Sequence, residues 1–267
     1  MKHTQMILLA GLLLSGSVLG AFPSVTEKQN EFQIETDGMS VTLWKWLGLK
    51  LHQKGALKNE NFFPVIHPFP KTGIQTESVK ILRNDGDVLI LQWKSKPFEH
   101  RFGAVVREEA DYCFKKDFPG MFIRMRLFNT SPEKTNLNQS FCFSAKNCPE
   151  MPTEKGLVKV DGQPTEAKAT SSGNYFLYTD PSGRTWGIIS ADLENKNRRL
   201  FANTPIRNKG NWLLGYIRPG SEKAFANGEF SSLHVILFPA KTLEDVRGIY
   251  EKLLRDRSLD PFWKYLQ

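Results

Sequence analysis

The chain has 267 residues, 40% of them hydrophobic and 24% charged, with a formal net charge of +8 at pH 7. This length suits one large domain or two small ones and is ample for a hydrophobic core. The basic residues are scattered and no nucleic-acid-binding motif is present, so nucleic acid is not the expected partner.

The first twenty residues have the three parts of a secretory signal peptide. Lys2 is basic, an apolar run follows over residues 6–14, and small residues lead to Gly20. The apolar run is too short to span about 30 Å of hydrocarbon comfortably. We therefore expect a signal peptide over 1–20 and a mature domain over 21–267, exported to the periplasm or the extracellular space, with no transmembrane segment after cleavage.

From Glu31 onward the sequence predicts strands almost throughout. Strands are expected over 39–47 and 49–53, whereas three prolines make 62–70 an extended aromatic-rich loop around His67. Residues 78–83 and 87–95 form the clearest hairpin, because Asn84-Asp85-Gly86 tolerates the positive φ of a tight turn. Both faces of the second hairpin strand are apolar, which predicts a strand covered on both sides.

Two long strands meet at a turn within residues 99–130. On the second strand the apolar side chains of Ile123, Met125 and Leu127 alternate with a mixed aromatic and basic face. Phe122, Arg124, Arg126 and Phe128 make up that second face. Its composition is unusual for a plain solvent-exposed face, so it is a candidate binding surface.

Further strands are predicted at intervals to the end of the chain, with one helix after them. The expected strands cover 139–144, 156–160, 175–178, 185–190, 198–202, 212–217 and 233–238. Thr242 can cap a helix over 242–256, with Glu244 and Asp245 in its first turn. Its apolar residues recur at helical spacing, which predicts packing on a sheet.

The three cysteines, Cys113, Cys142 and Cys148, leave several arrangements open. An odd number means that at least one is free or paired between chains. Cys142 and Cys148 flank a short loop, Cys113 and Cys142 could bridge neighbouring strands, and all three could be buried thiols. Their spacing fits no zinc motif, so no metal is expected. No phosphate loop or zinc helix is present elsewhere in the sequence, and no cofactor is expected.

The strands together predict an all-β protein, a large antiparallel two-sheet sandwich with one C-terminal helix. The run from residue 120 to 138 is an apolar strand that ends in an Asn-Thr-Ser turn, followed by a Leu. This run resembles a strand of galactose-mutarotase-like supersandwich domains. Such domains occur in sugar epimerases, polysaccharide lyases and glycoside hydrolases, so the resemblance implies this fold and a carbohydrate partner. The epimerases of this family use two histidines and a glutamate, and no residues of this sequence can be matched to those three one by one.

The non-core faces of these strands, if no bulge intervenes, form one concave wall that could bind a saccharide. The catalytic candidates are His100, His234, Glu108 and Tyr216. The ligand-binding candidates are Arg124, Arg126, Trp186, Trp212, Arg218 and His67. Aromatic rings stack on sugar rings, and arginine binds carboxylate or sulfate groups in a two-pronged fashion.

Structural interpretations of the same residues remain open. Arg124 and Arg126 beside Glu108 are more typical of a cross-strand ion-pair ladder than of a ligand-binding surface. Trp186 and Trp212 are typical of a core, and His234 of a buried structural histidine. Glu108 and Glu109 face opposite sides of their strand, so they cannot form one acid–base pair.

Three functions are compatible with this pattern. The first is an exported carbohydrate-binding or carbohydrate-processing accessory protein that binds a carbohydrate, such as an anionic polysaccharide, on the concave aromatic and arginine face. The alternative is an enzyme of the polysaccharide lyase or sugar epimerase type, in which His100 or His234 converges with an Arg and a Tyr or Glu. A third is a structural envelope protein that docks a partner chain.

Overall fold

A computed structural model gives the fold of the chain. It describes residues 23–36, 39–44, 49–53, 63–67, 74–99, 104–131, 140–145, 150–153, 156–159, 170–179, 185–190, 199–203, 213–218 and 228–262. Side chains are described for 23–36, 40–43, 74–99, 104–131, 174–177, 185–190 and 233–262. The predicted signal peptide over 1–20 lies outside the described residues.

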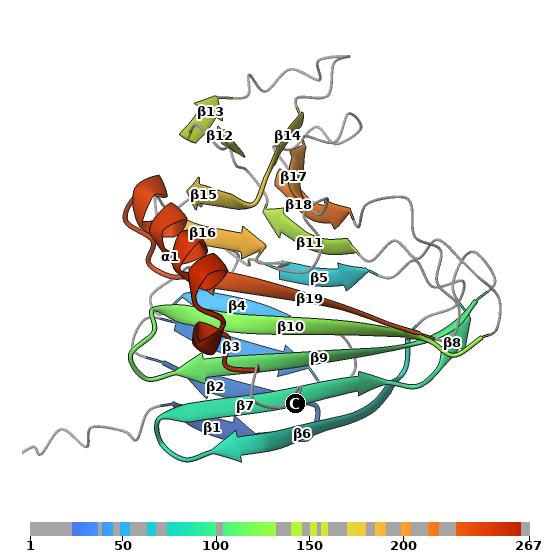
Figure 1. The fold of residues 1–267 in the computed structure, drawn as a ribbon. Coiled ribbons are helices and arrows are strands. Elements are labelled where there is room, and N and C mark those ends of the chain that lie inside the picture. Colours follow the sequence, from blue (N-terminus) through green and yellow to red (C-terminus); the bar gives the residue numbers. More distant parts are fainter. Residues whose placement is uncertain are drawn as a thin grey trace, which may run out of the picture.

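The largest sheet has eight strands, and all of its pairings are antiparallel (Figure 1). Seven of them follow the order β15 (Tyr175–Thr179), β16 (Thr185–Ser190), β19 (Gly228–Leu237), β10 (Gly120–Asn129), β9 (Val105–Lys115), β7 (Val88–Ser95) and β6 (Thr76–Asn84). The short strand β8 (Phe98–Glu99) pairs with β9 beside this path.

Two smaller antiparallel sheets and a two-stranded ribbon complete the described strands. The four-stranded sheet, which lies behind the large sheet in Figure 1, consists of β1 (Ser24–Glu27), β2 (Glu31–Glu35), β3 (Met39–Trp44) and β4 (Leu49–Gln53). The five-stranded sheet has the order β14 (Thr170–Gly173), β17 (Arg199–Asn203), β18 (Leu213–Arg218), β11 (Ser140–Ala145) and β5 (Phe63–His67). The ribbon pairs β12 (Glu150–Thr153) with β13 (Gly156–Lys159).

The main core lies between the large sheet and the four-stranded sheet. Leu91, Tyr112 and Ile123 stand side by side on β7, β9 and β10, and all three are buried. Phe32 and Val41 from β2 and β3 belong to the same buried cluster. We call the face of the large sheet that bears these residues its inner face. The predicted all-β fold, with antiparallel sheets packed face to face, is therefore confirmed.

The C-terminal helix α1 (Leu243–Arg255) covers part of the opposite, outer face of the large sheet (Figure 1). Thr242 caps it as predicted, because its Oγ1 accepts the Asp245 N–H at 3.1 Å and Asp245 accepts the Thr242 N–H at 3.0 Å. Val246 and Leu253 are buried in one cluster with Val235 of β19. A short 3-10 helix, η1 (Arg257–Leu259), follows the helix.

The β6–β7 hairpin is also as predicted. Gly86 has a φ of 87°, and a carboxylate oxygen of Asp85 accepts the Val88 N–H at 2.8 Å. On β7, Leu91 packs in the main core while Ile90 packs on the outer face with the helix. The second hairpin strand is thus covered on both sides, as its sequence predicts.

Two predicted boundaries are wrong. Residues 62–70 are not wholly a loop, because β5 occupies Phe63–His67 and pairs with β11. β5 ends the path of its sheet, and an edge strand tolerates the missing N–H of Pro64. The last strand begins at Gly228 and not at Leu233.

One of the cysteine arrangements is excluded. Cys113 is a free, buried thiol that packs in the cluster beneath α1, so it forms no bridge to Cys142. Burial raises the pKa of this thiol to about 12. Cys148 lies outside the described residues.

Candidate functional site

The register of β9 and β10 determines which side chains share the outer face. Arg124 stands opposite Asp111, Arg126 opposite Glu109, and Phe128 opposite Arg107. On the other side of β9, Gln92 and Lys94 of β7 stand opposite the same two acids. These residues lie beyond the part of the outer face covered by apolar contacts with α1.

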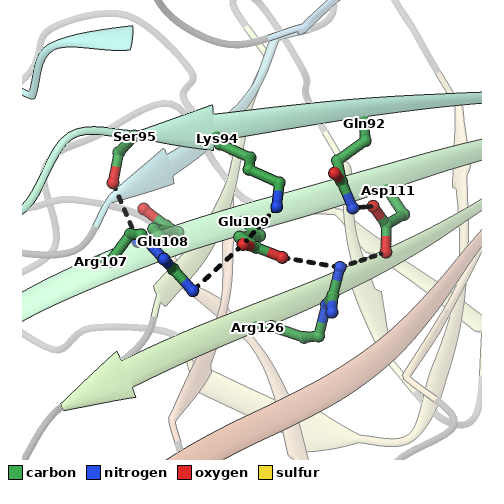
Figure 2. A network of polar contacts seen from close by, with 8 residues as sticks. All are labelled: Gln92, Lys94, Ser95, Arg107, Glu108, Glu109, Asp111 and Arg126. Atoms are coloured by element: carbon green, nitrogen blue, oxygen red, sulfur yellow. Dashed lines mark hydrogen bonds and ion pairs between the residues drawn. The ribbon is translucent and has the colours of Figure 1, made fainter. Parts of the chain in front are cut away.

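Glu109 lies at the centre of a polar network (Figure 2). Its side chain is only 3% exposed, and its Oε1 lies 3.0 Å from Lys94 Nζ and 3.4 Å from Arg107 Nη2. Its Oε2 lies 2.8 Å from Arg126 Nη2. One buried carboxylate therefore holds three cations, each from a different strand.

Asp111 extends the network along β9. Its Oδ2 lies 2.9 Å from Arg126 Nη2, and its Oδ1 accepts a hydrogen bond from Gln92 at 2.8 Å (Figure 2). Burial raises the pKa of Asp111, while the positive charge of Arg126 and the Gln92 hydrogen bond oppose the rise. Arg126 is thus fixed between two acids.

The ring of Phe128 lies close to two of these cations. The Arg107 guanidinium carbon is 4.7 Å from the ring centroid and that of Arg126 is 5.9 Å from it, both within cation–π range. We call Lys94, Arg107, Arg126 and Phe128 the Phe128 platform. The side chains of Lys94 and Arg107 are 32% and 36% exposed, so the platform is open to solvent in part.

The charges of the platform and its acids do not cancel. Lys94, Arg107 and Arg126 carry three positive charges, and Glu109 and Asp111 carry two negative charges. A surface with a partly exposed aromatic ring, fixed cations and a net positive charge can bind a ligand that carries an acidic group.

Arg124 has a different partner. Its Nη2 donates to Asp260 Oδ2, in the segment that follows η1, and its guanidinium carbon lies 5.2 Å from the centroid of the Phe262 ring. Both charged side chains are buried. Burial raises the pKa of Asp260, and the positive charge of Arg124 opposes the rise.

The predicted cross-strand ion-pair ladder exists, but Glu108 is not one of its acids. Arg126 pairs with Glu109 and Asp111, whereas Glu108 lies opposite Leu127 on the inner face. The N–H of Glu108 donates to Ser95 Oγ at 2.9 Å (Figure 2). The prediction that Glu108 shares a wall with Arg124 and Arg126 is therefore wrong, while the opposite facing of Glu108 and Glu109 is confirmed.

His234 also belongs to the inner face, because it stands opposite Ile123. It is 1% exposed. β9 and β19 flank β10, and Glu108 and His234 pair with positions four residues apart on β10. From strand spacing and rise, their backbones are roughly 16 Å apart. These two catalytic candidates do not converge.

Trp186 lies in the core and not on a ligand-binding face. It is 2% exposed, and its ring centroid is 4.2 Å from that of Phe238. Tyr216 and Arg218 lie on β18 and His67 lies on β5, but their side chains are outside the described set. His100 and Trp212 lie outside the described residues altogether. The single concave wall is therefore not assembled as predicted: Arg124 and Arg126 share a face, and Glu108, His234 and Trp186 do not join them.

Sequence reasoning missed Lys94, Arg107, Glu109, Asp111 and Asp260 as members of the polar surface. Alternation along the strands could have identified four of these. Arg107, Glu109 and Asp111 are every second residue of one strand and therefore share a face. Lys94 follows Trp93 and therefore lies on the face opposite to it. No local pattern could have identified Asp260 as the partner of Arg124, because the two are 136 residues apart in the chain.

No protein-family model and no curated protein sequence matches the chain. Solved structures do match it. The galactosidase domain of an alpha-galactosidase–sucrose kinase has a TM-score of 0.54 at 9% identity, over 80% of this chain and 41% of the other. An alpha-N-acetylgalactosaminidase from Bifidobacterium bifidum has a TM-score of 0.52 at 10% identity, over 84% and 39%.

A galactose mutarotase related enzyme from Lactobacillus acidophilus has a TM-score of 0.47 at 8% identity, over 79% of this chain and 98% of the other. The resemblance of fold to carbohydrate-processing proteins rests on the two structures with TM-scores above 0.5. The chain spans less than half the length of the two structures with the higher TM-scores.

Within the described ranges, no cluster of three or more His, Cys, Asp or Glu side chains could hold a metal ion. The helices that the structure describes include none with the length and apolar character to cross a membrane.

Proposed function

We propose that the protein is an exported, non-catalytic carbohydrate-binding protein that binds anionic saccharides on the Phe128 platform. The observation that carries this proposal is the arrangement around Glu109. One buried carboxylate fixes three cations beside an aromatic ring on a partly open sheet face.

The chemistry of the platform fits a saccharide with carboxylate or sulfate groups. The partly exposed ring of Phe128 can stack on the apolar C–H face of a sugar, and the partly exposed side chains of Lys94 and Arg107 can donate to an acidic substituent. Because Glu109 already orders these side chains, little rotamer entropy remains to be lost when a ligand binds. The fold, shared with domains of carbohydrate-processing proteins, and the predicted signal peptide support the same proposal.

Binding without catalysis is preferred because of the placement of the acid–base candidates. Glu108 and His234, the two whose side chains are described, are buried on the inner face, and their backbones lie about 16 Å apart. General acid–base catalysis needs groups within hydrogen-bond reach of one reacting centre.

A glycan array of neutral, uronate-containing and sulfated oligosaccharides tests the proposal on the mature chain. We expect binding to acidic glycans, lost in Phe128→Leu and Arg107→Gln. Arg83→Gln, which removes an equivalent charge on distant β6, serves as the control and should bind as the wild type does. Absence of glycan binding, or binding that both platform variants retain, would overturn the proposal.

A further inference from the structure

Arg124 lies beside the Phe128 platform and has an incomplete set of partners. Its side chain is 6% exposed, and its Nη2 donates to Asp260 Oδ2. The other oxygen of Asp260 accepts the Phe262 N–H at 2.9 Å. Among the described residues, Asp260 therefore reaches the guanidinium with one oxygen, not in the two-pronged geometry that arginine and carboxylate favour.

Several buried donors of the two arginines have no acceptor in the described part of the chain. Arg124 Nε and Nη1 are buried without a hydrogen-bond partner, and so is Nε of Arg126, two residues away on the same face of β10. Nε and Nη1 carry three of the five N–H groups of a guanidinium. Buried polar groups are almost always hydrogen-bonded, so these donors call for an acceptor.

The charges of this region also favour an anion. It combines four cations with three acids: Lys94, Arg107, Arg124 and Arg126 with Glu109, Asp111 and Asp260. One unit of positive charge is therefore in excess. An oxyanion would supply both the missing acceptors and the missing negative charge.

The segment that covers Arg124 is attached at few buried points. Arg257, Ser258 and Leu259 are exposed, and only Asp260 and Phe262 are buried. The carboxylate of Asp256 bonds locally to Ser258. Release of Asp260 and Phe262 would therefore uncover Arg124, at the cost of the place of Phe262 in the buried cluster with Val246 and Leu253 of α1.

We propose that Arg124, with Nε of Arg126, forms a binding site for an oxyanion group, a carboxylate or a sulfate, and that Asp260 is its internal competitor. An incoming oxyanion has two or three oxygens free to accept from several donors at once, whereas one oxygen of Asp260 is held by Phe262. Binding displaces Asp260 and detaches the segment from Arg257 to Phe262. This inference does not rest on the proposed function, because inorganic sulfate alone can test it.

The test is calorimetric titration of the mature chain with sodium sulfate, against sodium chloride at equal ionic strength. We expect sulfate-specific binding that Arg124→Gln abolishes and Arg83→Gln leaves unchanged. Asp260→Asn should bind sulfate about tenfold more tightly or better, because it removes a competitor that keeps the free site mostly occupied. Equal or weaker binding by Asp260→Asn would overturn the inference, as would the absence of sulfate-specific binding by the wild type.

Hydrogen exchange of the wild type gives a second readout that needs no variant. The Phe262 N–H, which donates to Asp260, should lose protection when sulfate saturates the protein, and unchanged protection would contradict displacement. A sulfated disaccharide distinguishes the two sources of the group. Tighter binding than inorganic sulfate, reduced by Phe128→Leu, indicates a saccharide, and equal binding indicates the free ion; either result requires the Arg124 site.

Discussion

Glu109 is the residue on which the outer-face network depends. It is buried, and it is the shared partner of Lys94, Arg107 and Arg126. A buried charge pair adds little net stability over apolar residues, but removal of one partner leaves the others uncompensated. The cost of losing Glu109 should therefore exceed that of losing an exposed acid.

We predict that Glu109→Gln lowers the free energy of unfolding by about 3 kcal/mol, because the shape is kept and the central charge is lost. Glu77→Gln, at an exposed position of β6, should change it by less than about 0.5 kcal/mol. Urea unfolding of the three proteins measures both effects. Equal stability of the two variants would show that Glu109 does not hold the three cations.

At the level of elements, the position of α1 depends on its close packing against β16 at Gly187. A Cβ atom added at Gly187 would lie 2.8 Å from Cγ2 of Val246 and 3.1 Å from Cβ of Leu237. Only a glycine lets the helix pack this closely on the sheet. The helix in turn limits the outer face to the open part that carries the Phe128 platform.

We predict that Gly187→Ala destabilises the protein by about 2 kcal/mol through overpacking, and Val246→Ala by about 2 kcal/mol through lost contacts. The double variant should lose about 1 kcal/mol less than the sum, since the smaller side chain at 246 admits the new methyl group. Denaturant unfolding of the wild type, the two single variants and the double variant measures the free energies of this double-mutant cycle.

Gly248 supplies the matched control for this cycle. It lies in α1 with no atom within 4 Å of an added Cβ, so Gly248→Ala should stabilise the protein by up to about 1 kcal/mol. Strictly additive costs at 187 and 246 would mean that these two residues do not set the distance between helix and sheet.

For the whole molecule, the sequence predicted the parts that depend on local periodicity. Alternation identified β9 and β10, the Asp85-Gly86 turn identified the hairpin, and helical spacing with Thr242 identified α1. The sequence-based prediction of which face bears Glu108 was wrong. A shift of one residue in the register between two strands moves every side chain of a strand to the opposite face, and the sequence does not fix that register.

Contacts between segments far apart in the chain could not be predicted from the sequence. Nothing near Arg124 or Asp260 in the chain indicates that they meet, because sheet order and the path of the C-terminal segment bring them together. The sequence also could not divide the outer face into a part under α1 and an open part. That division decides which aromatic and basic side chains remain available to a ligand.

The central claim, that acidic saccharides bind at the Phe128 platform, is tested most directly by mapping backbone amide shifts during titration with an acidic oligosaccharide found by the array. We predict that the shifted signals cluster at Lys94, Arg107 and Phe128, with little change at His234 and Ser190 on the inner face. Shifts that cluster at His234 and Ser190 instead, with the platform unchanged, would contradict the account.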